Sequence, residues 1–101
     1  MSQLDKMIHD HSRLRILTYL ASSKEQKVSF NDIKENLEFS SGNLSIQLKK
    51  LSEAKYINIE KSFKDNKSLT TVFISEKGLT QLNQYINEME KIIKTLKDNT
   101  K

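Results

Sequence analysis

Residues 29–75 read SFNDIKENLEFSSGNLSIQLKKLSEAKYINIEKSFKDNKSLTTVFIS, and this stretch decides the fold. Its first half predicts two helices separated by a tight turn at residues 38–40. Its second half predicts two β-strands with a polar hairpin tip between them. A pair of short helices joined by a tight turn is a helix-turn-helix candidate, and the hairpin that follows makes that candidate more specific.

The two helices of this pair have recognisable starts. Ser29 is expected to cap the first helix, with Asp32 completing a capping box, and this helix should end near Leu37. Ser40 is expected to cap the second helix. At 100° per residue, three leucines of the second helix fall within about 60° of one another and should face a core. These leucines are Leu44, Leu48 and Leu51.

The predicted strands are residues 56–63 and 69–75, which are rich in β-branched and aromatic side chains. Between them lies a basic tip, residues 64–68. Asp65 and Asn66 within the tip tolerate the left-handed backbone conformation that a tight hairpin demands. The segment 28–30 before the first helix of the pair is a short β-prone stub.

Helices are also predicted on both sides of this stretch. Apolar residues at spacings of three and four predict a helix over residues 4–21, with a break near His11 and Ser12. The pattern is compatible with one bent helix and with two short helices. Ser75 should cap a last helix with a heptad seam. The seam positions are Leu79, Leu82, Ile86, Met89, Ile93 and Leu96.

Composition excludes several classes of protein. The 101 residues are 36% apolar and 30% charged, with net charge +4 and no cysteine. Disulfides, cysteine-bound zinc and thiol catalysis are therefore excluded. The N-terminus has early acidic residues and no apolar run, and apolar stretches elsewhere are short, so neither a signal peptide nor a membrane segment is expected. We expect a cytoplasmic protein.

Catalysis and metal binding have little support in the sequence. The acidic residues are scattered, serine and histidine have no triad spacing, and no glycine-rich phosphate loop is present, so we expect neither an enzyme nor a cofactor. The nearest metal candidate is His9, Asp10 and His11. Residues two apart point to different sides of a helix, so His11 is expected on the core stripe and His9 exposed.

Three segments together resemble a known family. They are SRLRILTYLAS (12–22), SFNDIKENLEFSSGNLSIQLKKLSEAKYINIEKSF (29–63) and TTVFISEKGLTQL (70–82). They resemble small single-domain winged-helix transcriptional regulators of the MarR/ArsR superfamily, over roughly residues 11–97. The hairpin corresponds to the wing of these proteins.

The resemblance implies a mainly α fold with a small β-hairpin, which is a winged helix-turn-helix with a long C-terminal dimerisation helix. A single DNA-binding domain would span residues 1–101, with its reading head at about 29–75. The dimerisation helix, about 76–97, would pair together with the N-terminal segment 1–21. The predicted dimer-interface residues are Leu4, Ile8, Leu79, Leu82, Ile86, Met89, Ile93 and Leu96.

Duplex DNA is the expected partner. Asn43 and Gln47 can each pair with adenine, and Ile46 suits a thymine methyl group. A helix N-terminus and lysines suit phosphate. Residues 40–75 contain six lysines and three acidic residues, a net charge of +3. The predicted DNA-binding residues are Ser40, Ser41, Gly42, Asn43, Ile46, Gln47, Lys49, Lys50, Lys61, Lys64 and Lys67.

Parts of the sequence depart from the family pattern. Lys55 and Glu38 stand where relatives usually carry glycine, so Lys55 must either adopt a conformation that glycine accepts more easily or end its helix differently. The wing carries lysines where relatives often carry arginine, the residue best suited to a narrow minor groove.

The predicted function is that of a sequence-specific, homodimeric transcriptional regulator. The alternative is a winged-helix adaptor that binds proteins without reading DNA. A small-molecule effector is compatible with either function, but no residue indicates one.

Overall fold

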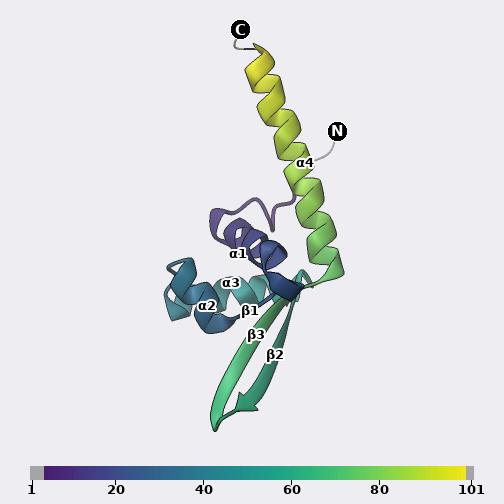
Figure 1. The fold of residues 1–101 in the computed structure, drawn as a ribbon. Helices are drawn as coiled ribbons and strands as arrows, with labels where there is room; N and C mark the ends of the chain where they lie inside the picture. The colour runs from purple at the N-terminus through teal and green to yellow at the C-terminus, as the bar shows by residue number, and fades with distance from the viewer. Residues whose placement is uncertain (1–3, 100–101) are drawn as a thin grey trace.

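The fold is seen in a computed structural model that describes residues 4–99. A helical body lies at the centre, and a β-hairpin and the end of a long helix leave it in opposite directions (Figure 1). This arrangement confirms the predicted mainly α class with a hairpin and a long C-terminal helix. The elements are α1 (His11–Ser22), a 3-10 turn η1 (Lys24–Gln26), β1 (Lys27–Ser29), α2 (Phe30–Asn36), α3 (Ser41–Glu53), β2 (Ile57–Lys64), β3 (Lys67–Ile74) and α4 (Glu76–Asn99).

The helix predicted over residues 4–21 is shorter than expected. Its regular part, α1, starts at His11. The cap is Asp10, whose carboxylate accepts from the Arg13 backbone N–H at 3.0 Å. Upstream, the Asp5 carboxylate accepts from the Met7 N–H at 2.8 Å. Aspartate side chains that bind nearby backbone groups compete with helical hydrogen bonds, and the chain forms turns there instead.

The helix-turn-helix is built as predicted. Ser29 and Ser40 accept from the backbone N–H groups of Asp32 and Asn43, both at 3.1 Å, which confirms the two caps. Between the helices, Glu38 takes a left-handed φ of 59°. The turn that α2 and α3 share is therefore tight and well defined.

Arg15 of α1 holds this turn. Its guanidinium donates to the Leu37 carbonyl at 2.8 Å and lies 5.4 Å from the centre of the Phe39 ring. A planar cation over an aromatic face adds an electrostatic attraction to the hydrogen bond. α1 is thereby bound to the segment that joins the two helices of the motif.

The sheet has three antiparallel strands in the order β1-β3-β2. β2 and β3 pair from Ile57 opposite Ile74 to Lys64 opposite Lys67. The connection is two residues long rather than the five predicted, because Asp65 and Asn66 take left-handed φ values of 52° and 63°. Such values are typical of the tight type I′ hairpin turn.

The core lies where α1, α3, the base of the sheet and the start of α4 meet. The predicted leucine stripe of α3 is buried there, as are Ile16, Leu17 and Leu20 of α1. Within residues 4–99 no helix combines the length and the apolar character needed to cross a membrane.

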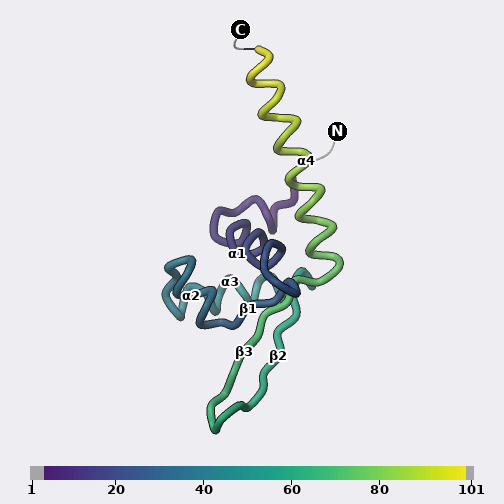
Figure 2. Tube along the Cα trace, in the orientation of Figure 1, coloured from purple at the N-terminus to yellow at the C-terminus, as the bar shows by residue number. Residues whose placement is uncertain are grey.

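α4 has two different halves. Gly78, Leu82 and Tyr85 are buried against the body, whereas every residue from 90 to 99 is exposed. At 1.5 Å per residue, the 24 residues of α4 extend about 36 Å. Its second half therefore projects away from the body, as the Cα trace in Figure 2 shows.

Candidate nucleic-acid interface

The outer side of α3 carries most of the residues predicted to contact bases. Asn43, Lys49 and Lys50 are exposed, and Ile46 is 54% exposed in the middle of this face. More than half of this isoleucine is open to water, so burial within the chain stabilises it only in part. The face therefore combines hydrogen-bonding, cationic and apolar groups on one accessible helix surface.

The N-terminus of α3 is open. Ser40 caps the helix, and Ser41 and Gly42 are exposed beside it. A Cβ atom added at Gly42 would meet nothing within 4 Å, so packing within the chain does not require glycine there. Backbone N–H groups at a helix N-terminus attract anions, and a residue without a side chain lets an anion approach closely.

Arg13 of α1 holds the side chain of Gln47 on α3, and sequence reasoning missed this contact. Its side chain is only 12% exposed and donates from Nη1 to Oε1 of Gln47 at 2.8 Å and from Nε to the Met7 carbonyl at 2.7 Å. Gln47 in turn donates from Nε2 to Oδ1 of Asn43 at 3.3 Å. Gln47 is half-buried and acts as a link between Arg13 and the exposed Asn43.

The chemistry of the donors determines how the Gln47 amide is oriented in the hydrogen-bonded chain Arg13–Gln47–Asn43. Arginine has no acceptor atom, so the Gln47 atom that it contacts must be the amide oxygen, and the amide nitrogen must then face Asn43. The only sequence signal for such a role was a charged residue inside a helix of apolar periodicity. The partner of Arg13 lies 34 residues away and is set by the crossing of α1 and α3.

The wing lysines divide between two faces of the hairpin. Side chains alternate along a strand, so Lys61 shares a face with Ile57 and Ile59, while Lys64 lies on the other. Lys64 stands directly opposite Lys67 at the tip, and both are exposed. Like charges directly opposite one another destabilise a hairpin. This pair therefore costs stability in the free protein and suits an anionic partner.

A groove joins the wing to α3. It is lined by Leu48 and Lys49 of α3 and by Ile59, Lys61 and Thr70 of the hairpin. The face of the wing that bears Lys61 is thus turned toward α3. The helix and the wing present one continuous surface rather than two separate ones.

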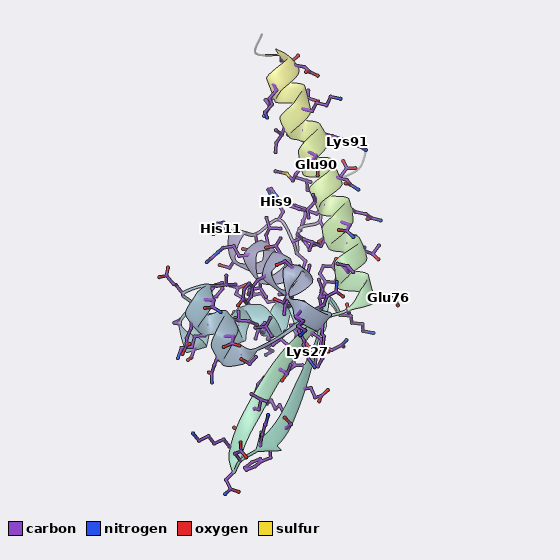
Figure 3. The ribbon with its side chains drawn as sticks, in the orientation of Figure 1. His9, His11, Lys27, Glu76, Glu90 and Lys91 are labelled. Atoms are coloured by element: carbon purple, nitrogen blue, oxygen red, sulfur yellow. The ribbon has the colours of Figure 1, made fainter. Side chains whose placement is uncertain are left out.

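The histidines do not form a metal site with each other. His11 is exposed, so its predicted place on the core stripe is wrong: the phase of α1 buries Ile16, Leu17 and Leu20 instead. His9 lies beside α4, with Nδ1 2.8 Å from the Tyr85 hydroxyl oxygen (Figure 3). Within residues 4–99 no three His, Asp or Glu side chains gather as metal ligands would.

Several residues predicted for a dimer interface pack within the chain instead. Ile8 is 0% and Leu82 is 2% exposed, and both belong to the core, so neither side chain is available to a partner. Leu4, Leu79 and Met89 are half-buried against the same core. The first three residues of the predicted N-terminal segment lie outside the described part of the chain. The predicted seam residues that remain open are Ile86, Ile93 and Leu96, and Ile92 is exposed beside them.

Residues 12–93 match the family described as "Winged helix DNA-binding domain". The chain therefore belongs to the winged helix DNA-binding domain family, a family of binding domains and not of enzymes. An uncharacterised protein of Methanocaldococcus jannaschii is 31% identical over 91 residues, covering 90% of this chain and 97% of that protein.

Solved structures share the fold. A transcriptional regulator homologue from Pyrococcus horikoshii superposes with a TM-score of 0.83 at 22% identity, covering 89% of this chain and 87% of that one. A MarR family regulator from Streptomyces coelicolor, solved in complex with DNA, has a TM-score of 0.75 at 14% identity, covering 91% and 60%. A mutant of MepR from S. aureus, bound to an oligodeoxyribonucleotide, has a TM-score of 0.74 at 17% identity, covering 94% and 71%. Family and fold together support a DNA-binding transcriptional regulator.

Proposed function

We propose that this protein is a homodimeric transcriptional regulator that reads a specific duplex DNA sequence with α3 in the major groove. The observation that carries the proposal is the exposed face of α3, where Ile46 is open to water between Asn43 and Lys50. A major groove about 12 Å wide admits one such helix. Two relatives in fold were solved with DNA bound, which supports this partner.

Asn43 and Ile46 are the residues that contact bases. Asn43 is exposed, and its Oδ1 keeps a second lone pair after accepting from Gln47, so its amide retains the acceptor and the donors that a bidentate contact to adenine uses. Ile46 is placed to contact a thymine methyl group. Gln47 is turned toward Arg13, and we assign it the role of positioning Asn43.

The N-terminus of α3 and the lysines of α3 and the wing contact phosphates. Ser41 and Gly42 offer backbone N–H groups at the N-terminus of α3. Lys49 and Lys61 line the groove between α3 and the wing, and Lys50 is exposed on α3. Lys64 and Lys67 form a cationic pair at the wing tip. These groups fix register along the backbone without reading sequence.

The second half of α4 is the proposed dimer contact. Ile86, Ile93 and Leu96 are 36%, 45% and 60% exposed on a helix that projects from the body. Their heptad spacing is typical of a helix that packs against another helix. A groove between α1 and α4, lined by Leu14, Met89 and Ile93 among others, continues the apolar surface. Two reading heads held this way would meet two half-sites of a roughly palindromic operator.

The dimer contact is tested by sedimentation of the full chain. Ile93→Lys would bury an unpaired charge in the interface and should yield a monomer at tens of micromolar, where the wild type is a dimer. Thr95→Lys adds the same charge two positions on, outside the seam, and should remain dimeric. Met89→Lys is the less clean variant, because Met89 also packs against its own core. A monomeric wild type, or a dimeric Ile93→Lys variant, would show that the seam is wrongly assigned.

DNA reading is tested by selecting bound duplexes from a random pool and titrating the selected and a scrambled duplex at several salt concentrations. Asn43→Ala should weaken the selected duplex by about 5- to 150-fold, the equivalent of ~1–3 kcal/mol for a base contact, and leave the scrambled duplex unchanged. Lys67→Ala should weaken both duplexes and flatten the slope of log K against log salt by up to about one unit.

Two results would overturn the proposal. If the wild type binds no duplex even at low salt, the alternative of a protein-binding adaptor is favoured. If Asn43→Ala weakens both duplexes equally or weakens neither, α3 is not the reading element.

A further inference from the structure

Phe63, near the wing tip, is an aromatic residue without an apolar neighbour on its own face. It is 76% exposed, the largest value among the exposed large apolar side chains of residues 4–99. It pairs across the hairpin with Ser68, and its other neighbours on that face are Lys61 and Thr70. Nothing within the hairpin therefore accounts for an aromatic side chain at this position.

The exposed large apolar residues fall into two groups. Four lie on α4, in and beside the proposed dimer seam. The other three are Ile46, Ile59 and Phe63, on α3 and on the face of the wing that is turned toward it. Phe63 thus belongs to the surface proposed to meet DNA and lies at its far end.

The length of the hairpin sets how far Phe63 reaches. Ile57 is buried at the body, and six strand residues at about 3.3 Å each place residue 63 roughly 20 Å further out. The DNA repeat of about 34 Å separates a major groove from the neighbouring minor groove by about half that length. With α3 in the major groove, residue 63 therefore reaches the adjacent minor groove.

The charges around Phe63 suit this location. Lys61 lies on the same face as Phe63, and the pair Lys64 and Lys67 follows at the tip on the opposite face. Lysines on both faces can contact the phosphates on either side of a groove. The wing has no arginine, the side chain that ordinarily enters a narrow minor groove. A phenyl ring has no hydrogen-bonding group for the groove floor, but it can slide between two base pairs.

We propose that Phe63 is an apolar wedge that enters the minor groove beside the α3 half-site, partly unstacks one base step and bends the duplex. The inference rests on the proposed DNA-binding function. The ligand is duplex DNA with a flexible pyrimidine–purine step at that position, because such steps kink most easily. Phe63 thereby contributes specificity through DNA deformability rather than through hydrogen bonds.

The test uses the full chain and the selected duplex, labelled at its ends for energy-transfer measurement of bending, with permanganate to detect unstacked thymines. Phe63→Ala should reduce the bend, remove the permanganate-reactive thymine and weaken the selected duplex about tenfold. Phe63→Leu keeps an apolar wedge and should retain most of the bend. Ser62→Ala, the neighbour on the opposite face, is the matched control and should behave as the wild type. Because Phe63 is exposed, the melting temperatures should be unchanged.

The possible results separate this inference from the proposed function. If Phe63→Ala bends and unstacks the selected duplex as the wild type does, the wedge is wrong while DNA reading stands. If Phe63→Ala instead alters sedimentation of the protein without DNA, the side chain is a protein contact and the wedge is wrong. Failure of the proposed function would show separately, as an Asn43→Ala variant with unchanged selectivity.

Discussion

The guanidinium of Arg13 donates a 2.8 Å hydrogen bond to the side-chain oxygen of Gln47, and this bond joins the first helix of the domain to the helix proposed to read DNA. The same guanidinium holds the Met7 carbonyl and lies 3.6 Å from the Asp10 carboxylate. One nearly buried cation thus ties the N-terminal segment, α1 and α3 together. The orientation of Asn43 depends on this arrangement through Gln47.

Loss of the two hydrogen bonds that Arg13 donates to Gln47 and to the Met7 carbonyl should reduce selectivity between DNA sequences without reducing general affinity for DNA. Arg13→Lys keeps the charge but cannot reproduce the two-directional hydrogen bonding, so Gln47 and Asn43 lose their fixed orientation. We expect the affinity ratio between selected and scrambled duplexes to fall about tenfold, the equivalent of ~1.4 kcal/mol of base discrimination, with the salt slope unchanged. Arg15→Lys is the control, since Arg15 holds the turn at Leu37, and it should lower stability more than selectivity. Unchanged selectivity in Arg13→Lys would contradict the idea that Arg13 positions Asn43 through Gln47.

The two glycines should respond oppositely to alanine. A Cβ at Gly78 would lie 2.1 Å from the Tyr56 carbonyl oxygen, a backbone atom, whereas a Cβ at Gly42 meets nothing within 4 Å. Gly78→Ala should lower the free energy of unfolding by about 1–3 kcal/mol or more, and Gly42→Ala should not lower it, because alanine favours the helix by up to ~1 kcal/mol. Urea denaturation measures both.

The Gly42→Ala variant also tests the phosphate site at the start of α3. Its added methyl group should hold a phosphate away from the backbone N–H groups and weaken selected and scrambled duplexes alike. Unaltered binding in a well-folded variant would place the phosphate elsewhere.

A glycine at position 55 should stabilise the protein. Lys55 follows α3 with a left-handed φ of 66°, which confirms the first of the two conformations expected for it. A residue with a Cβ pays about 1 kcal/mol there relative to glycine. Thermal denaturation should show a gain of roughly that size for Lys55→Gly and none for Lys55→Ala, which keeps the strain. An equal gain in both variants would point to removal of the charge instead.

Tyr56 should make stability fall in alkali. Burial raises the pKa of Tyr56 to about 12, and its hydrogen bond to the Asp5 carboxylate, with the negative charge of that group, adds to the effect. The unfolded chain has the ordinary value of about 10. Because the folded pKa is the higher one, the neutral phenol contributes stability that is complete below pH 10 and is lost as the pH rises through about 12.

Denaturation between pH 8 and 12 tests this linkage. Tyr56→Phe should start less stable, by about 1.5–3 kcal/mol for a hydrogen bond to a charged group, and then lose less stability with rising pH than the wild type. Tyr19→Phe removes a phenol whose partner is the exposed Asn36 and serves as the control. Parallel curves for the wild type and Tyr56→Phe would contradict the pKa argument.

The features that the sequence predicted correctly depend on interactions between residues close together in the chain. The caps at Ser29, Ser40 and Ser75 and the leucine stripe of α3 depend on residues within one turn of each other, and the structure confirms them. The hairpin was predicted for a similar reason, since Asp65 and Asn66 tolerate the left-handed turn. The prediction failed at residues 4–10 because the Asp5 side chain accepts from a nearby backbone N–H there, although the apolar spacing is that of a helix. His11 was misplaced for another reason, since α1 turns Ile16, Leu17 and Leu20 toward the core.

The sequence by itself therefore determined most of the helices and strands, the caps at Ser29, Ser40 and Ser75, and which face of α3 is polar. Only the tertiary structure decided that Ile8 and Leu82 lie in the core, that Gln47 is held by Arg13, and that the wing turns its Lys61 face toward α3. The physical reason is separation along the chain. Caps and stripes arise from neighbours three or four residues apart, whereas burial and the Arg13–Gln47 bond depend on how distant elements cross in space.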